Sequence, residues 1–423
     1  MKSNLIILFL IILISFVPGL SFGQDSLKEE PDVRLGVGQI KITPEMPVLM
    51  SGYDARKTPS IGIHDDLYAS ALYFSDKKTR ILLITTDLIG FKSDLAEDIK
   101  NIISSKIGIP PENIMICAVH NHGGPSVKTY ENSVPDSNEA YIKFLKEKLT
   151  QLAADASKNL VRFHMGIGKG TCNMNINRRA EFADGGIWLG RNPDGPCDHE
   201  LDVVQFKDLN NKTLAVLLNW PCHGTTSGQE NYQITGDWPG AAARYIKKQL
   251  GNETIVTMTA GASADINPIY GPGNDFDEIE AIGYHVGVNA MKTFAQTETF
   301  PVKSLQIRNS TMTFAGKKEC KDQFPQTSYE SGPDVEIRLT VLKIGNLLLC
   351  GISGELMTEI GMEIKRQSPY SETLVVTHCN GSSGYICTDK SFKEGGYEIK
   401  VTKLMPGAEK LITGKFQELI NTY

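Results

Sequence analysis

Residues 113–126 read Asn-Ile-Met-Ile-Cys-Ala-Val-His-Asn-His-Gly-Gly-Pro-Ser, an apolar run that leads straight into two histidines and a glycine-rich turn. On an extended chain, residues two apart point to the same side, so we expect the imidazoles of His120 and His122 to face one point. The turn at Gly123 and Gly124 ends the strand and lets another segment approach the backbone closely. A metal site at the edge of a sheet is presented in this way, but the His-x-His pair alone favours two histidines in an ordinary polar loop until further ligands are found.

The residues before this stretch predict the layering of the fold. Residues 80–87 form a nearly continuous run of Ile, Leu and Thr, typical of a strand that is covered on both faces. Residues 93–107 have the pattern of a helix that ends at Gly108. Strand, helix and strand in succession indicate α/β architecture.

The rest of the chain predicts one α/β domain over residues 24–423, with mixed β-sheets flanked by helices. We expect further strands at 34–43, 67–74, 161–167, 202–206, 214–220, 254–258 and 374–378. A second, antiparallel sheet is expected from 302–314, 335–342 and 346–350. Helices are expected at 137–160, 237–250, 277–294, 355–366 and 406–419, and residues 168–198 are expected to form a polar loop region.

The net charge of the chain and its N-terminal residues limit the possible binding partners and the cellular location of the protein. The 423 residues carry a formal net charge of −6 and no long Lys/Arg run, which argues against a nucleic-acid partner. Residues 1–23 have the pattern of a signal peptide, with Lys2, an apolar core at 5–17 and small residues before a cut ahead of Gln24. That core is short for a membrane anchor, the alternative interpretation. We therefore expect an exported protein, periplasmic or secreted, with no transmembrane segment in the mature chain.

The eight cysteines fit an exported protein that holds some disulfides. Cys172 with Cys197, and Cys379 with Cys387, are plausible pairs, although spacing cannot establish pairing. Cys117 lies in an apolar run and is expected to be a buried thiol.

Four side chains share one placement, in a glycine-marked turn just beyond an apolar strand: His120, His223, Glu355 and Tyr385. Open α/β sheets bind ligands beyond their strand ends. A catalytic zinc ion takes about three protein ligands and leaves a position for water. His120, His223 and Glu355 would supply that set. Separately, His223 is also compatible with a loop histidine and Glu355 with a charge at a helix N-terminus.

Short motifs in a fixed order resemble the neutral (neutral/alkaline, non-lysosomal) ceramidase family over nearly the whole mature chain. They lie at residues 37–44, 62–65, 120–122, 175–178, 219–225, 354–355, 384–385 and 395–398. The resemblance implies an N-acyl amide hydrolase with one Zn2+ ion and a small-molecule or lipid-like acyl substrate. It implies zinc ligands at His120, His223, Glu355 and Tyr385. It also implies substrate contacts at His122, Arg178 and Tyr397.

Two departures from the family pattern concern the substrate. The family's enzymes carry a serine in an Asp-Val-Ser-Pro-like turn, whereas residues 265–268 here read Asp-Ile-Asn-Pro. Asn267 can orient a substrate or water but cannot be acylated as a serine can. The family's enzymes also add a C-terminal immunoglobulin-like domain, and the resemblance here stops shortly after Tyr397. A zinc esterase, a glycan-directed hydrolase and a non-catalytic ligand-binding protein on the same fold are therefore alternatives.

Other polar residues have simpler interpretations. His64 and Asp65 either orient a ligand or make the turn before a strand. Asp237 is expected to cap the helix that follows it, with a role in the site as the alternative. His199 and His378 are expected to be ordinary residues of polar loops.

Overall fold

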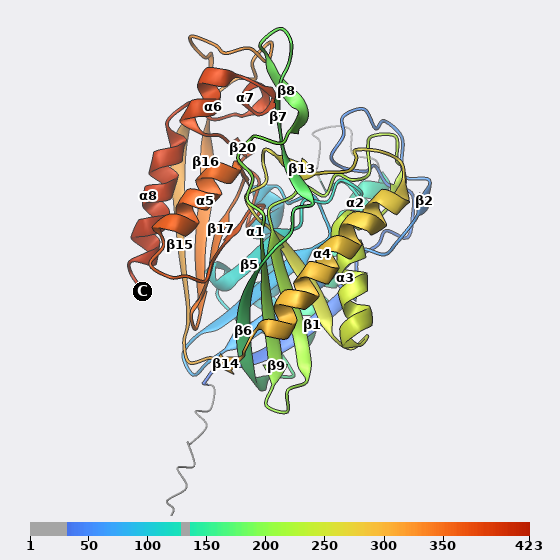
Figure 1. Ribbon diagram of the computed structural model, residues 1–423. Helices are drawn as coiled ribbons and strands as arrows, with labels where there is room; N and C mark the ends of the chain where they lie inside the picture. Colours follow the sequence, from blue (N-terminus) through green and yellow to red (C-terminus); the bar gives the residue numbers. More distant parts are fainter. Residues whose placement is uncertain (1–31, 128–135) are drawn as a thin grey trace, which may run out of the picture. The chain divides into compact units, whose positions relative to one another are not determined.

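The computed structural model describes residues 32–127 and 136–423, and the expected leader at 1–23 lies outside the described residues. A nine-stranded mixed sheet forms the centre of the fold (Figure 1). In spatial order its strands are β12 (Ile255–Ala260), β10 (Thr213–Trp220), β9 (Glu200–Asp208), β6 (Val161–Thr171), β1 (Arg34–Lys41), β3 (Tyr68–Ser75), β4 (Arg80–Thr86) and β5 (Ile114–Ala118), with β14 (Phe300–Pro301) beside β6.

A second sheet of four strands packs against the first. Its order is β15 (Leu305–Lys317), β16 (Ser331–Ile344), β17 (Leu347–Ile352) and β19 (Thr373–Val376). One buried cluster joins the two sheets, with Phe74, Leu83 and Phe206 from the large sheet and Leu342 and Leu349 from the small one. The expected second sheet is confirmed, although β19 pairs with β17 in parallel rather than antiparallel fashion.

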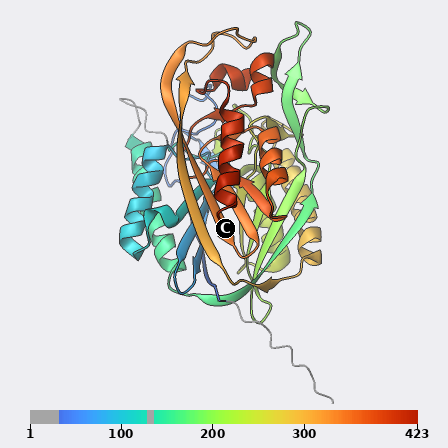
Figure 2. The same ribbon diagram turned by 90° about the vertical axis from the view of Figure 1, so that its left-hand side faces the viewer.

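Helices cover the outer faces of both sheets (Figures 1 and 2). The apolar stripes of α1 (Ser93–Ile107) and α2 (Asp136–Ala156) are buried with β3, β4 and β5. Those of α3 (Asp237–Leu250) and α4 (Phe276–Gln296) are buried with β9, β10 and β12. On the four-stranded sheet, α5 (Thr358–Gln367) and α8 (Ala408–Ile420) fill the same role. No helix among the described residues has the length and apolar character needed to cross a bilayer.

The expected strand–helix–strand unit is present as β4, α1 and β5, and the two strands pair in parallel. Side chains of β4 alternate between two cores: Leu82 and Ile84 face the helices, whereas Ile81 and Leu83 face the four-stranded sheet. The strand is thus covered on both faces, as its continuous apolar run predicts.

Two expectations of local structure are wrong. The expected loop at 168–198 contains the end of β6 and a hairpin, β7 (Asn175–Glu181) and β8 (Ile187–Asn192), which continues in β13 (Ile266–Pro268). The helix expected from residue 355 begins at Thr358, because β18 (Glu355–Leu356) first pairs in parallel with β20 (Tyr385–Ile386). Both places consist of short strands whose polar side chains contribute to the candidate metal centre described below. Because these strands lack the apolar alternation of a core strand, the sequence pattern does not identify them.

The remaining short elements lie away from the two sheets' shared core. A two-stranded ladder joins β2 (Gly62–Ile63) to β11 (Gln233–Ile234), η1 (Pro111–Asn113) precedes β5, and α6 (Asp389–Glu394) and α7 (Tyr397–Val401) follow β20. All eight cysteines are free thiols in the structure. Cys117 and Cys379 lie opposite each other in a β-bridge.

Candidate metal centre

Segments from three strand ends meet at one edge of the fold. Asn121, just after β5, forms a β-bridge with Gly224, just after β10. Cys117, near the end of β5, forms another with Cys379, just after β19. Gly224 allows the first of these contacts, because a Cβ at this position would lie 2.9 Å from Asn121 Cα. The strand ends therefore place His120, His223 and His378 in one small volume.

Both candidate histidine ligands are held through Nδ1. The Nδ1 of His120 lies 2.9 Å from the carbonyl oxygen of Ile89, and that of His223 lies 3.0 Å from the carbonyl oxygen of Ile266. A carbonyl can only accept, so each Nδ1 carries a proton, and in the neutral form of each imidazole Nε2 keeps its lone pair. The expectation that His120 lies on extended backbone is wrong, because its φ is 61°. This left-handed turn still brings the two imidazoles of the His-x-His pair together, with ring centroids 4.8 Å apart.

The Nε2 atoms of His120 and His223 face a carboxylate oxygen of Glu355. Glu355 Oε2 lies 3.4 Å from His120 Nε2 and 3.5 Å from His223 Nε2, and no described residue forms a hydrogen bond with this buried oxygen. The Nε2 of His122 lies 3.2 Å from that of His120. Acceptor atoms facing one another repel unless a cation lies among them. Tetrahedral ligands about 2.0–2.2 Å from zinc stand roughly 3.3–3.6 Å apart, so the donor set fits such an ion.

The protonation states suit a cation. Burial, Arg178 and His120 lower the pKa of His223 to about 4. Burial and the neighbouring His120 and His223 hold the pKa of His122 well below its ordinary value. Although burial alone would raise the pKa of Glu355, the histidines hold it well below the ordinary range. At neutral pH His122 and His223 are therefore neutral and Glu355 is ionised, the forms that bind metals.

Arg178 and Tyr385 adjoin this donor set. Arg178, from β7, is 5% exposed and places Nη1 3.3 Å from His223 Nε2 and Nη2 3.2 Å from the Tyr385 hydroxyl. Its Nε donates to Glu398 Oε1 at 2.8 Å. Burial and the Glu355 carboxylate raise the pKa of Tyr385 well above its ordinary value. Burial alone would lower the pKa of Arg178, but Tyr385 and Glu398 keep it above its ordinary value, so the guanidinium is a fixed cation.

A cavity of about 330 Å³ opens beside the donor set. Its polar lining comes from Tyr53, His122, Arg178, Asn267, Tyr385 and Tyr397, and its apolar lining includes Ile176, Leu189, Pro268 and Pro272. Asn267 lies on β13, and its Oδ1 accepts from Arg178 Nη1 at 3.4 Å. Tyr397 packs edge-on against Tyr385, with ring centroids 5.9 Å apart.

The structure brings together all eight residues chosen from the sequence. They are His120, His122, Arg178, His223, Asn267, Glu355, Tyr385 and Tyr397. Their spatial neighbours include residues that the sequence argument left out. Tyr53 packs against His122 with ring centroids 5.2 Å apart, and Arg56 donates to the His122 carbonyl oxygen at 2.6 Å.

His378 is not an ordinary loop residue, and that expectation is wrong. Its ring stacks on His120 with centroids 3.8 Å apart and an interplanar angle of 13°. With His120 and Glu355 it forms a second group of close donor atoms. The chain holds His378 at a φ of 53°, a conformation that non-glycine residues adopt only when the surroundings enforce it. The signal was available, because His378 follows β19 just as His120 follows β5.

Substitution of His378 separates two ways in which it can serve the centre. His378→Phe keeps a flat ring against His120, whereas His378→Ala removes it. If stacking positions His120, we expect His378→Ala to weaken metal affinity about 10–100-fold, the effect of losing a supporting contact, and His378→Phe to restore most of it. Chelator competition measures both affinities. Equal losses in the two variants would instead indicate that His378 donates to the metal.

The other singled-out residues hold loops in place. Asp65 accepts from Thr235 Oγ1 at 2.6 Å and from the Gly236 amide at 2.9 Å. Asp237 accepts from the amides of Thr226, Ser227 and Trp238, so it ties the loop after His223 to the start of α3, whose N-cap position is taken by Gly236. His199 makes a 2.6 Å contact with Asn175 and remains outside the centre.

Comparison with known proteins places this geometry in a family. The family model of the neutral/alkaline non-lysosomal ceramidase N-terminal region matches residues 33–268. Neutral ceramidase from Pseudomonas aeruginosa is 23% identical over 312 residues, 68% of this chain and 46% of that protein. Neutral ceramidase 2 of Arabidopsis thaliana is 23% identical over 237 residues, 52% of this chain and 30% of that protein. The chain thus aligns with less than half the length of each relative.

Solved structures show the same fold. A ceramidase complexed with C2 superposes with a TM-score of 0.79 at 18% identity, covering 93% of this chain and 75% of that one. The crystal structure of the neutral ceramidase from Pseudomonas aeruginosa gives a TM-score of 0.76 at 19% identity, covering 93% and 74%. With more than half of its residues matched by the family model, the chain belongs to the neutral/alkaline non-lysosomal ceramidase family.

Proposed function

We propose that this protein is an exported zinc-dependent hydrolase that cleaves an N-acyl amide bond, as a neutral ceramidase does. His120, His223, Glu355 and Tyr385 are the proposed zinc ligands, and His122, Arg178, Tyr397 and Asn267 are the proposed contacts of substrate and intermediate. One observation carries the proposal: the Nε2 atoms of His120 and His223 converge on a Glu355 oxygen that accepts no hydrogen bond from the described residues, beside the cavity that His122 and Arg178 line.

The residues around the donor set can each take a different role in hydrolysis. When bound, zinc would lower the pKa of a water molecule toward about 7 and polarise the acyl carbonyl. Arg178 presents a fixed positive charge where an oxyanion develops, and such a preorganised donor stabilises the transition state. His122 lines the cavity, and its Nδ1 has no hydrogen-bond partner among the described residues, so its imidazole is the proposed proton donor to the leaving amine. Asn267, next to Arg178, can orient the carbonyl.

The lining of the cavity supports an acyl substrate. Apolar side chains of Ile176 and Leu189 lie on the same walls as the polar groups of Arg178 and Tyr397. This combination is typical of sites that bury an apolar body and fix one polar group. The names of the relatives specify ceramide, and a long-chain ceramide is the substrate class that we propose to test first.

The test is a substrate panel on the purified protein with its metal content measured in parallel. The panel contains a long-chain ceramide, an N-acyl amino acid, a fatty-acyl ester and an acylated sugar. We expect about one zinc per chain, amide turnover that a chelator abolishes, and recovery when zinc is returned. Full activity in a metal-free preparation would contradict the zinc proposal. Turnover of the ester or acylated sugar alone would contradict the amide assignment.

A further inference from the structure

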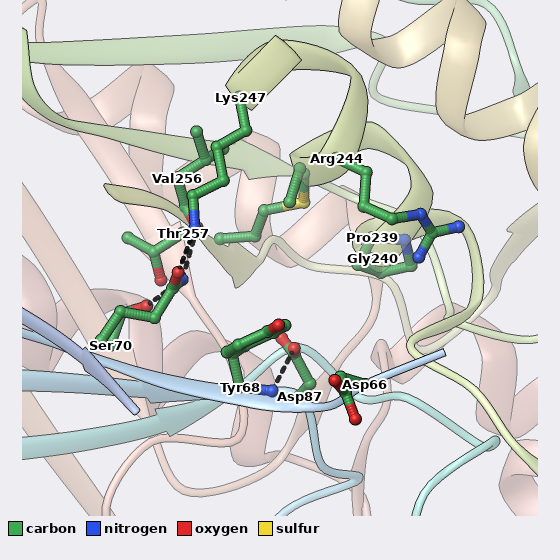
Figure 3. Close-up of a pocket in the computed structure, with 13 residues that line it drawn as sticks. Asp66, Tyr68, Ser70, Asp87, Pro239, Gly240, Arg244, Lys247, Val256 and Thr257 are labelled. Atoms are coloured by element: carbon green, nitrogen blue, oxygen red, sulfur yellow. Dashed lines mark hydrogen bonds between the residues drawn. The ribbon is translucent and has the colours of Figure 1, made fainter. Parts of the chain in front are cut away.

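A second cavity lies apart from the metal centre, between the strands β1 and β3 and the helix α3. Its volume is about 230 Å³, and none of its lining residues lines the cavity at the metal centre. Figure 3 shows Lys247 and Arg244 reaching it from α3, with Tyr68, Asp66 and Asp87 on the side opposite. The lining is therefore positive on one side and negative on the other.

Lys247 is the cation that the cavity leaves without a counter-charge. Its Nζ lies 2.6 Å from the Gln39 side-chain oxygen and 5.7 Å from the centre of the Tyr68 ring, and no carboxylate of the described residues forms an ion pair with it. An ammonium has three protons to donate, and the neutral Gln39 oxygen takes one. Nearby Arg244, in contrast, already pairs with Asp65 and Glu280. A partly buried, unpaired ammonium favours an anion as its partner.

On the side of the cavity opposite Lys247, the Asp87 carboxyl group is a hydrogen-bond acceptor. Its Oδ2 accepts from the Tyr68 amide at 2.8 Å, and no described residue donates to its other oxygen. Burial raises the pKa of this carboxyl to about 7. Such a group is stabilised by a ligand that donates a hydrogen bond or brings a positive charge. Between the two charged sides, Met258 and Ala243 contribute apolar surface.

We propose that this cavity binds a small carboxylate with an adjacent donor, an α-hydroxy or α-amino acid, its carboxylate on Lys247 and its hydroxyl or ammonium on Asp87. The volume equals that of about seven or eight liquid water molecules, at about 30 Å³ each, which suits a molecule of this size. The apolar surface accommodates the aliphatic part of the ligand.

The backbone of Asp87 connects this cavity to the metal centre. The carbonyl oxygen of Asp87 accepts from Asn121 Nδ2 at 3.1 Å, that of Leu88 from the Asn121 amide at 3.1 Å, and that of Ile89 from His120 Nδ1 at 2.9 Å. A ligand that fixes the Asp87 side chain thereby restrains the three carbonyls that hold the His120 turn. Binding is independent of the proposed function, whereas an effect of the ligand on turnover rests on it.

Calorimetric titration of the full chain with L-lactate and L-alanine tests the binding. Propionate, which lacks the donor, and methyl lactate, which lacks the charge, are the matched probes. We expect both acids to bind and both matched probes to bind at least about tenfold more weakly. Absence of heat from lactate and alanine, or equal affinity for all four compounds, would overturn the proposal.

Two variants identify the cavity as the site. Lys247→Met should weaken both acids at least about tenfold, whereas Lys248→Met, an exposed neighbour on the same helix, should leave them unchanged. Asp87→Asn removes the negative charge at similar volume and should weaken alanine more than lactate, because only alanine carries a cation. Should Asp87→Asn unfold, Lys247→Met still decides the question. Unchanged binding in Lys247→Met would refute this location.

Discussion

His223→Ala is expected to lose its metal and to reduce hydrolysis by more than about a thousandfold. The imidazole is fully buried, and its Nε2 faces Glu355 Oε2 at 3.5 Å and Arg178 Nη1 at 3.3 Å. Removing it leaves only His120, Glu355 and Tyr385 of the proposed ligands, which hold a divalent ion far less tightly, and a metal ion supplies several kcal/mol of transition-state stabilisation. Elemental analysis of the purified variant and turnover of the best amide substrate measure the two losses.

The loss must be separated from simple unfolding. Alanine at position 223 also removes the Nδ1 contact to Ile266 and creates a cavity, so His223→Gln, which keeps most of the volume and a hydrogen-bonding group, is the companion variant. His285→Ala, on the exposed face of α4, is the matched control and should retain metal and activity. A folded His223→Gln protein with a full metal complement and unchanged turnover would refute the proposed centre.

Strand ends explain why so much of this centre could be predicted from the sequence. His120 and His223 each follow an apolar run, and the bridges Asn121–Gly224 and Cys117–Cys379 bring the carboxyl ends of β5, β10 and β19 together. A local pattern thus encodes a long-range meeting of His120 and His223. The expectations for β4, α1 and β5 rest on the same strong periodicity, and the structure confirms them.

Most of what escaped prediction depends on contacts between segments far apart in the sequence. His378 follows a strand as His120 does, but its stacking on the His120 ring appears only in the fold. The hairpin of β7 and β8 has polar side chains directed to the site, so its sequence resembles a loop. Glu398 lies in the motif at residues 395–398, but its role is not visible in the sequence because its partners Arg178 and Arg179 are about 220 residues away.

Arg178→Met is expected to lower turnover about 100–1,000-fold, the usual effect of removing one oxyanion-stabilising donor, and to destabilise the fold by about 3–5 kcal/mol. The destabilisation arises because Glu398, 1% exposed, loses its 2.8 Å partner and keeps only Arg179 at 2.9 Å. Denaturant unfolding and steady-state kinetics measure the two effects. Arg366→Met removes an exposed arginine from a surface pair with Glu363 and should change neither quantity.

A second substitution separates the two roles of Arg178. Glu398→Gln in the Arg178→Met background neutralises the carboxylate left without one partner, so we expect much of the lost stability to return. Turnover should stay low, because the double variant still lacks the positive charge beside His223 and Tyr385. Recovery of turnover together with stability would show that Arg178 only supports the fold. Low turnover in a restabilised protein is the result expected if its guanidinium contacts the reacting acyl group.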